Sequence, residues 1–206
     1  MPFSVLFVCT GNVCRSPMAE LLGQAWADPQ ADLATSSAGV AALVGHGIDT
    51  STASVLGQLG IDPSRHRARQ FEAYMAARAD LVLTAEAVHR DAIMAEVPSA
   101  FRRTFTMKEF ARLARRATST DPAEVVAELA WRRGADGPLP GDFDDMPDPY
   151  RGRISRARLV ADQVTDAVRA AVEVLGFAPH AHAPVITSAR PAPGRRPSPR
   201  PRPRPR

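Results

Sequence analysis

The spacing of apolar residues changes repeatedly along the chain, which predicts alternating strands and helices. The continuous apolar run at 5–8 consists of β-branched, aliphatic and aromatic residues and is typical of a strand buried on both faces of a parallel sheet. Apolar residues then recur at helical spacing: Leu21, Leu22, Ala25 and Trp26. A helix with one face in the core is therefore expected. Ser16 and Pro17 resemble its N-cap and its first helical residue, where proline's missing N–H costs nothing.

The alternation continues to residue 175. Further strands are expected at 33–38, 81–84 and 103–106, and further helices at 50–59, 71–79, 85–95 and 155–175. Gly60 and Gly176 follow two of these helices, as C-terminal glycines commonly do. The pattern predicts an α/β fold: a single domain with a central four-stranded parallel sheet flanked by helices on both faces. Ligands of such sheets bind at the carboxyl ends of the strands.

The segment between the first strand and its helix has the composition of an anion-binding loop. It reads Cys9-Thr10-Gly11-Asn12-Val13-Cys14-Arg15-Ser16-Pro17. Backbone N–H groups at a helix N-terminus attract an anion and favour the thiolate form of a nearby cysteine. Arg15 offers a planar fork for two phosphoryl oxygens. Gly11 and Asn12 are residue types that tolerate the left-handed backbone that a tight loop needs.

A second segment supplies an acid. Asp148-Pro149-Tyr150 lies in the polar stretch 142–151, and cleavage of an aryl phosphate ester requires a proton for the departing oxygen. Asp-Pro alone is an ordinary turn sequence that occurs elsewhere in this chain. Together with the cysteine loop, however, it resembles the low-molecular-weight protein tyrosine phosphatase family over residues 3–177.

The resemblance implies a role for each matching residue. Cys9 would be the nucleophile that forms a cysteinyl-phosphate, Arg15 would bind the phosphoryl oxygens, and Asp148 would be the general acid and later the base. Ser16 would hydrogen-bond the thiolate, and Tyr150 would stack on the substrate ring. The remaining loop residues, Thr10, Gly11, Asn12, Val13 and Cys14, would surround the phosphate.

The resemblance also concerns the surroundings of the loop. Asn12, Ser37 and His66 fall where the family keeps a hydrogen-bond network that braces it. Cys14 could form a reversible disulfide with Cys9, or it could be a small apolar filler of the loop wall, and the sequence leaves both open. Neither a cofactor nor a metal is implied, and the family is mostly monomeric.

The substrate class depends on which branch the chain follows. Residues 37–47 are similar to the bacterial branch that acts on tyrosine autokinases of polysaccharide export. Residues 9–12, 79–84 and 105–110 are similar to the protein-arginine phosphatase branch. That second branch typically has threonine at the position of Val13 and phenylalanine at the position of Tyr150. Phosphotyrosine is therefore the favoured substrate, and phosphoarginine is the alternative. Arsenate reduction is disfavoured because thioredoxin-coupled reductases need additional cysteines and this chain has two.

Composition changes this picture at the C-terminus. Residues 178–206 contain seven arginines and no acidic residue, so residues 1–177 hold 19 of the 26 basic residues and all 22 acidic ones. The pI near 9.8 thus reflects the tail, which is expected to be disordered, and does not indicate a specific nucleic-acid-binding domain. No signal peptide or membrane span is expected, and a reactive thiolate suits the reducing cytoplasm. The expected domain is 1–177, with an extra helical segment at about 110–141 whose helix covers 123–133.

Overall fold

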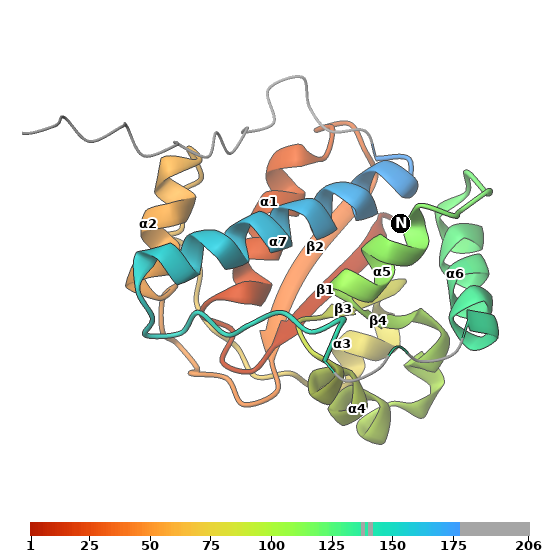
Figure 1. The fold of residues 1–206 in the computed structure, drawn as a ribbon, viewed down its shortest axis with the longest axis horizontal. Coiled ribbons are helices and arrows are strands. Elements are labelled where there is room, and N and C mark those ends of the chain that lie inside the picture. The colour runs from red at the N-terminus through yellow and green to blue at the C-terminus, as the bar shows by residue number, and fades with distance from the viewer. Residues whose placement is uncertain (137–138, 140–141, 178–206) are drawn as a thin grey trace, which may run out of the picture.

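Four parallel strands form the central sheet in the order β2-β1-β3-β4 (Figure 1). The computed structural model describes residues 1–136, 139 and 142–177, so the tail predicted for 178–206 lies outside the described residues. The strands are β1 (Phe3–Cys9), β2 (Leu33–Gly39), β3 (Leu81–Thr84) and β4 (Thr104–Thr106). Cys9 pairs with Gly39 and Val8 with Thr84. The strand that ends in the predicted nucleophile is therefore central, with a neighbour on each side.

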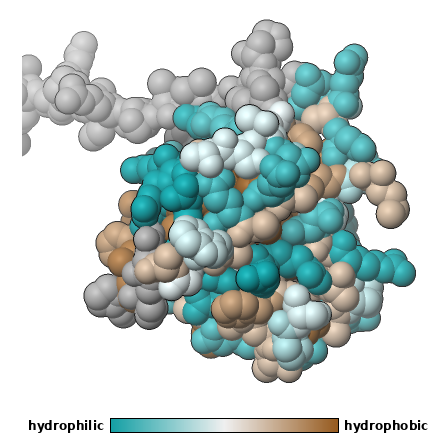
Figure 2. Space-filling view, turned by 90° about the vertical axis from the view of Figure 1, so that its right-hand side faces the viewer, coloured by the Kyte–Doolittle hydropathy of each residue, from teal (hydrophilic) through white to brown (hydrophobic). Residues whose placement is uncertain are grey.

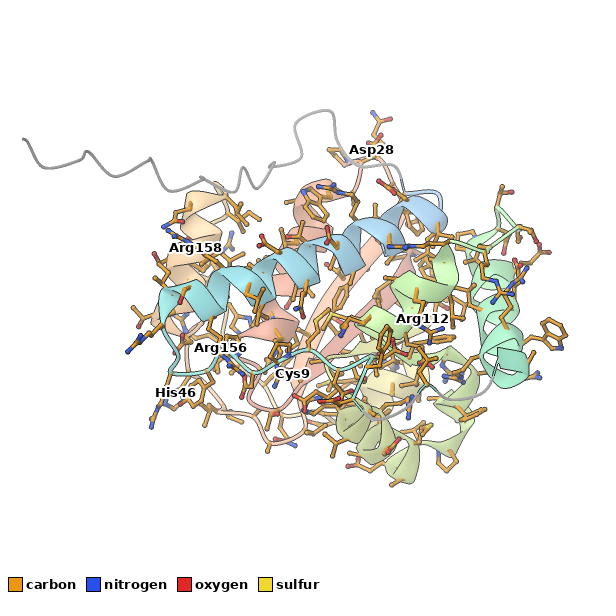
Figure 3. The ribbon with its side chains drawn as sticks, viewed as in Figure 1. Cys9, Asp28, His46, Arg112, Arg156 and Arg158 are labelled. Atoms are coloured by element: carbon orange, nitrogen blue, oxygen red, sulfur yellow. The ribbon has the colours of Figure 1, made fainter. Side chains whose placement is uncertain are left out.

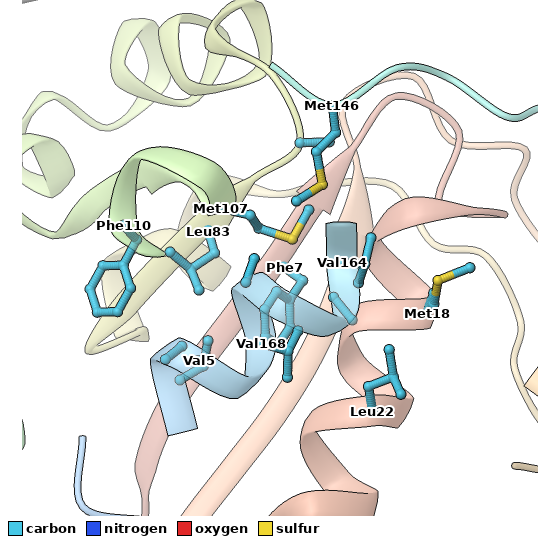
Figure 4. Packing of buried hydrophobic residues seen from close by; sticks show 14 of the residues in the cluster. Val5, Phe7, Met18, Leu22, Leu83, Met107, Phe110, Met146, Val164 and Val168 are labelled. Carbon is cyan, nitrogen blue, oxygen red and sulfur yellow. The ribbon is translucent and has the colours of Figure 1, made fainter. Parts of the chain in front are cut away.

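Helices cover both faces of the sheet, which confirms the predicted fold class. Helices α1 (Arg15–Trp26), α2 (Thr50–Gln58), α5 (Met107–Ala114), α6 (Pro122–Asp136) and α7 (Ile154–Val174) contribute to one hydrophobic core. Helices α3 (Ala73–Arg78) and α4 (Ala87–Glu96) and the 3₁₀ helix η1 (Pro98–Arg103) contribute to the other. Figure 4 shows the first core, where Phe7 and Leu83 of the sheet face Val164 and Val168 of α7. Because successive residues of β1 alternate between these two cores, the strand is buried on both sides, as its apolar run predicted.

The start of α1 differs from the prediction. The helix begins at Arg15, with Cys14 as the N-cap and no side-chain capping bond, so Ser16 and Pro17 already lie inside its first turn. The prediction of Ser16 as the cap was wrong because the Ser16 hydroxyl is used elsewhere: it lies 3.0 Å from Cys9 Sγ. The earlier start brings the backbone of Arg15 and Ser16 into the end of the helix that faces the loop.

Two elements were not expected from the hydrophobic pattern. The 3₁₀ helix η1 directly precedes β4, and helix α5 directly follows β4. Helix α5 has a capping box in which Thr106 Oγ1 accepts from the Glu109 N–H while Glu109 bonds back to the Thr106 N–H. A Thr-x-x-Glu sequence before an apolar residue is a known helix start, so this helix was detectable in the sequence.

Helix α6 confirms the predicted extra helix and is packed against the domain. Val125 and Leu129 are buried in the first core, and the Arg133 guanidinium lies 4.6 Å from the ring centres of Phe101 and Phe105. The face that carries α6 is a mixture of polar and apolar residues (Figure 2), and Trp131 on that helix is 69% exposed. Among the described residues, none of the helices combines the length and the apolar character that crossing a membrane requires.

Candidate active site

The turn from β1 into α1 places Cys9 at the carboxyl edge of the sheet. In Figure 3, Cys9 lies at the end of β1, beneath the segment that leads into α7. Cys9 is 2% exposed, and its sulfur is in hydrogen-bond contact with the Ser16 hydroxyl. Asn12 has the left-handed backbone that the loop composition predicted, with φ of 53°. Gly11 does not: its φ is not positive, and an added Cβ would meet nothing closer than Val13 at 3.4 Å.

A buried hydrogen-bond network connects this loop to the neighbouring elements of the fold. Asn12 Nδ2 donates to Ser16 Oγ at 2.9 Å and to Ser37 Oγ at 2.8 Å, and Asn12 Oδ1 accepts from the Arg69 N–H. Ser37 in turn donates to Glu20 at 2.6 Å, and His66 Nε2 lies 2.8 Å from the Asn12 carbonyl oxygen. The predicted trio of Asn12, Ser37 and His66 is thus brought together. A single side-chain amide connects the loop, α1, β2 and the segment after α2.

Gly39 is required where β2 passes the loop. A Cβ on this residue would lie 2.4 Å from the Thr10 carbonyl oxygen and 2.8 Å from the Asn12 nitrogen. Such distances are far below van der Waals contact with backbone atoms that cannot move aside. The loop can therefore approach the sheet this closely only beside a glycine.

The Arg15 side chain is buried and links the loop to two other segments. Its Nη1 donates to Glu86 and, at 2.8 Å, to the Met146 carbonyl oxygen. Its Nη2 lies 3.4 Å from Asp148 Oδ1. Its Nε is buried and has no hydrogen-bond partner within the described part of the chain. The Nε–H is therefore a donor that remains for an anion at the site.

The loop that carries Asp148 is more exposed than the cysteine loop. The Asp148 side chain is 51% exposed, and Tyr150 at the same surface is 37% exposed. The Asp148 carbonyl oxygen accepts from Arg156 Nε at 2.7 Å, and the Arg151 guanidinium lies 5.1 Å from the centre of the Tyr150 ring. The carboxylate is therefore accessible at the mouth of the cysteine loop, where an acid must meet a substrate oxygen.

Backbone groups before Asp148 are fixed to the rest of the domain. The Met146 N–H donates to the Ala85 carbonyl at 2.9 Å, and Asp145 Oδ1 accepts from the Ala87 N–H at 2.7 Å. From α5, Lys108 Nζ donates to the carbonyls of Phe143 and Asp145, and Arg112 pairs with Asp144 at 2.8 Å. Glu86, Asp142, Asp145 and Asp148 line an open groove beside the cysteine loop together with Met146 and Pro147.

Cys14 is buried in the loop wall and, like Cys9, is a free thiol. Burial is the main cause that raises the pKa of Cys14 to about 12, and the nearby Asp49, Cys9 and Asp148 act in the same direction. Val13 is buried beside Cys14, Ala68 and Leu43, so the inner wall of the loop is apolar here. Cys14 is therefore a protonated, buried thiol at neutral pH.

Several residues of the site were missed in the sequence. Glu86 and His89 come from the start of α4 and contact Arg15 and Thr10 respectively. The other site residues that the sequence did not indicate are Glu20, Arg69 and, in α5, Lys108 and Arg112. No local motif marks these residues, because each acts through a contact made across the fold. Among the described residues, no group of three or more His, Cys, Asp or Glu side chains is placed to hold a metal ion.

Comparison with known proteins finds the same architecture and related sequences. The family model described as low molecular weight phosphotyrosine protein phosphatase matches residues 4–128. The probable low molecular weight protein-tyrosine-phosphatase EpsP of Ralstonia solanacearum is 41% identical over 107 residues, which are 52% of this chain and 71% of that protein. The protein-arginine-phosphatase of Geobacillus stearothermophilus is 32% identical over 164 residues, 80% of this chain and 90% of that one.

A solved structure agrees with these sequence relatives. The tyrosine phosphatase Wzb from Escherichia coli K30, in complex with sulphate, superposes with a TM-score of 0.63 at 28% identity. The superposition covers 85% of this chain and 100% of that one. The matched part of the family model ends at residue 128, before Asp148.

Proposed function

The chain belongs to the low molecular weight protein tyrosine phosphatase family, and we propose that it hydrolyses phosphotyrosine in proteins through a cysteinyl-phosphate intermediate. The observation that carries the proposal is the Arg15 guanidinium. It lies in the loop that starts at Cys9, and it also holds the Asp148 carboxylate at 3.4 Å. One side chain thus links the proposed nucleophile loop to the proposed acid.

The chemistry divides into two displacements at phosphorus. In the first, the Cys9 sulfur forms a bond to phosphorus while the bond to the phenolic oxygen breaks, and Asp148 gives that oxygen its proton. In the second, Asp148 accepts a proton from water as the water oxygen attacks phosphorus, and the sulfur departs with its electron pair. Inorganic phosphate is released and the thiolate is restored.

Electrostatics in the loop serve both steps. The Ser16 hydroxyl lies 3.0 Å from Cys9 Sγ, and a hydrogen bond donated from it to the sulfur would stabilise the negative charge of the thiolate. The loop N–H groups and Arg15 surround the equatorial phosphoryl oxygens, where charge is concentrated in the loose transition state. Tyr150 lies on the same loop as Asp148 and would stack on the substrate ring.

Turnover of p-nitrophenyl phosphate tests this proposal. The wild type is expected to release phosphate, Cys9→Ser is expected to release none, and Asp148→Asn is expected to be slow. Asp142→Asn is the matched control, since Asp142 lines the same groove but has no assigned role. Acid quenching of a reaction with the wild type should trap a phosphorylated Cys9. Phosphate release by Cys9→Ser at the wild-type rate would refute the proposal.

A protein-arginine phosphatase activity is the second candidate. It is supported by the relative from Geobacillus stearothermophilus, which matches 80% of this chain. Val13 and Tyr150 argue for phosphotyrosine, and Val13 packs in the apolar cluster with Ala68 and Leu43, which a hydroxyl group would disturb. Phosphotyrosine and phosphoarginine peptides should be compared with the wild type and with Val13→Thr. Equal or better wild-type activity on phosphoarginine would reverse the assignment.

We further propose a phosphorylated protein, such as a bacterial tyrosine autokinase, as the partner, and the cytoplasm as the location. The partner is supported by the similarity of residues 37–47 to the branch that acts on such kinases. The location is supported by the two free thiols. A reducing compartment preserves a reactive thiolate of the kind proposed for Cys9.

A further inference from the structure

His89 is a buried histidine that has no role in the reaction described above. It belongs to α4 and is 2% exposed, yet its Nε2 lies 2.8 Å from the hydroxyl of Thr10, the residue directly after the nucleophile. The two residues are 79 positions apart in the sequence. A polar contact of this kind between α4 and the loop suggests more than packing, because apolar residues would fill the same space at lower cost.

The surroundings of the His89 ring determine whether it is charged and which ring nitrogen carries the proton. Burial lowers the pKa of His89 and the Arg15 guanidinium lowers it further, while Glu86, Asp145 and Asp148 act in the opposite direction. The ring is therefore neutral at neutral pH and carries one N–H. Its Nδ1 is buried and has no partner within the described residues. A buried N–H without an acceptor is rarer than an unused acceptor, so the proton is assigned to Nε2.

This tautomer fixes the direction of the hydrogen bond to Thr10. The Nε2–H group donates, so the Thr10 oxygen accepts, and the hydrogen of the Thr10 hydroxyl is left for another acceptor. The loop backbone at this point is held independently, because the Thr10 carbonyl accepts from the Ala41 N–H at 3.0 Å. Thr10 is exposed and directly follows Cys9, so its hydroxyl hydrogen can be directed towards an anion bound in the cysteine loop.

We propose that His89 is a positioning residue that holds the Thr10 hydroxyl as a hydrogen-bond donor to a phosphoryl oxygen of the bound substrate. This inference rests on the proposed phosphatase function and adds a side-chain donor to the backbone N–H groups and Arg15. The Thr10 hydroxyl touches the ligand, whereas His89 acts through Thr10. The donor contributes to binding of the phosphoryl group in both the substrate and the product.

The test compares substitutions that keep or remove the donor. Thr10→Val removes the hydroxyl at constant shape, and His89→Phe removes its partner at similar volume. Each is expected to weaken competitive inhibition by inorganic phosphate, and to lower kcat/KM for a phosphotyrosine peptide, by about threefold to tenfold. The double variant should lose no more than either single variant, because both remove the same contact.

A pair of amide substitutions separates positioning from packing. His89→Gln can place an N–H near the position of Nε2 and is expected to recover most of the lost affinity, whereas His89→Asn places its amide near Nδ1 and is expected not to. Val88→Ala, at the exposed neighbouring residue of α4, is the control for changes in the helix.

Three results would overturn the inference: unchanged inhibition by phosphate in Thr10→Val, additive losses in the double variant, or equal losses in His89→Gln and His89→Asn. Failure of the proposed function would look different, since the wild type itself would then release no phosphate from the peptide. Thermal unfolding of each variant, compared with the wild type, identifies a loss that comes from misfolding.

Discussion

The cysteine loop and the loop that carries Asp148, here called the acid loop, both contact Arg15. Different kinds of contact hold the two loops in place. The cysteine loop is largely buried. Its shape depends above all on the amide of its own residue Asn12, which is hydrogen-bonded to Ser16, Ser37 and the Arg69 backbone. The acid loop is exposed, and distant side chains such as Lys108 grip its backbone carbonyls. The first loop is thus held largely through one of its own side chains, and the second through backbone groups that side chains of α5 and Arg15 contact.

The difference fits the roles that we propose for the two loops. A loop that binds an oxyanion has to present its N–H groups in a fixed geometry, because preorganised donors need no rearrangement during the reaction. An acid that meets an incoming substrate has to remain accessible, and a half-exposed carboxylate satisfies this. Substitutions in the first loop should therefore affect stability and activity together, whereas those around the second should affect activity alone.

The largest expected effect is at the residue that the two loops share. Arg15→Lys keeps the charge but loses the planar fork, and it also breaks the contacts to Asp148 and the Met146 carbonyl. We expect kcat/KM for p-nitrophenyl phosphate to fall by about 10³-fold. A fall of less than about tenfold would mean that a point charge is sufficient and that the guanidinium geometry is not used.

Removing the acid should have the next largest effect. Asp148→Asn is expected to lower kcat by about 10²-fold, with little change in inhibition by inorganic phosphate. The loss should be larger for phenyl phosphate than for p-nitrophenyl phosphate, because the poorer leaving group depends more on protonation. Equal losses on both substrates would contradict the role of Asp148 as the proton donor.

The buried network can be broken from the cysteine loop itself. Asn12→Ala leaves the buried Ser16 and Ser37 hydroxyls and the Arg69 N–H without this partner. It also replaces asparagine at positive φ by a residue that tolerates this backbone less well, so we expect the free energy of unfolding to fall by about 2–3 kcal/mol. Asn12→Gly removes the strain but not the loss of the amide and serves as the matched control. Denaturant unfolding measures both, and a loss confined to Asn12→Ala would assign the effect to backbone strain.

The hydrogen bonds that hold the acid loop can be removed by a substitution in α5. Lys108→Met removes the donor to the Phe143 and Asp145 carbonyls, so Asp148 is held less firmly. We expect kcat to fall by about threefold to tenfold, again more for phenyl phosphate, with the unfolding free energy nearly unchanged. Arg115→Met is the control, because it removes a positive charge from the end of the same helix. An equal fall of kcat in Arg115→Met would show that the effect of Lys108→Met comes from the change in net charge.

The last expected effect is confined to high pH and concerns Cys14. Its pKa is raised from the ordinary 9.0 to about 12, so the folded chain binds this proton more tightly than the unfolded chain does. The contribution to stability is complete below about pH 9 and is lost as the pH rises towards 12. Cys14→Ala should therefore lose less stability than the wild type across this window. Parallel slopes of unfolding free energy against pH would contradict the raised pKa.

The predicted and observed elements differ where local and tertiary preferences compete. The strands of the sheet were predicted within one or two residues, and β1 and β3 carry apolar runs that are buried on both faces. Ser16 was wrongly predicted as a helix cap, since its hydroxyl has a stronger use beside Cys9. Helix α5 was missed, although the Thr106–Glu109 capping box was present in the sequence. The candidate cysteine loop was found as a contiguous motif, whereas its contacts with Glu20, Glu86 and His89 were not.

The sequence by itself determined the order of strands and helices, because hydrophobic period is a local property of the chain. Its contiguous motifs also predicted the nucleophile loop and the acid. Only the tertiary structure decided how Asp148 meets Arg15, which carbonyls Lys108 holds, and that His89 reaches Thr10. These contacts join segments between about 40 and 130 residues apart. No spacing rule encodes such distances, since they follow from the way the parallel strands bring their carboxyl ends to one edge of the sheet.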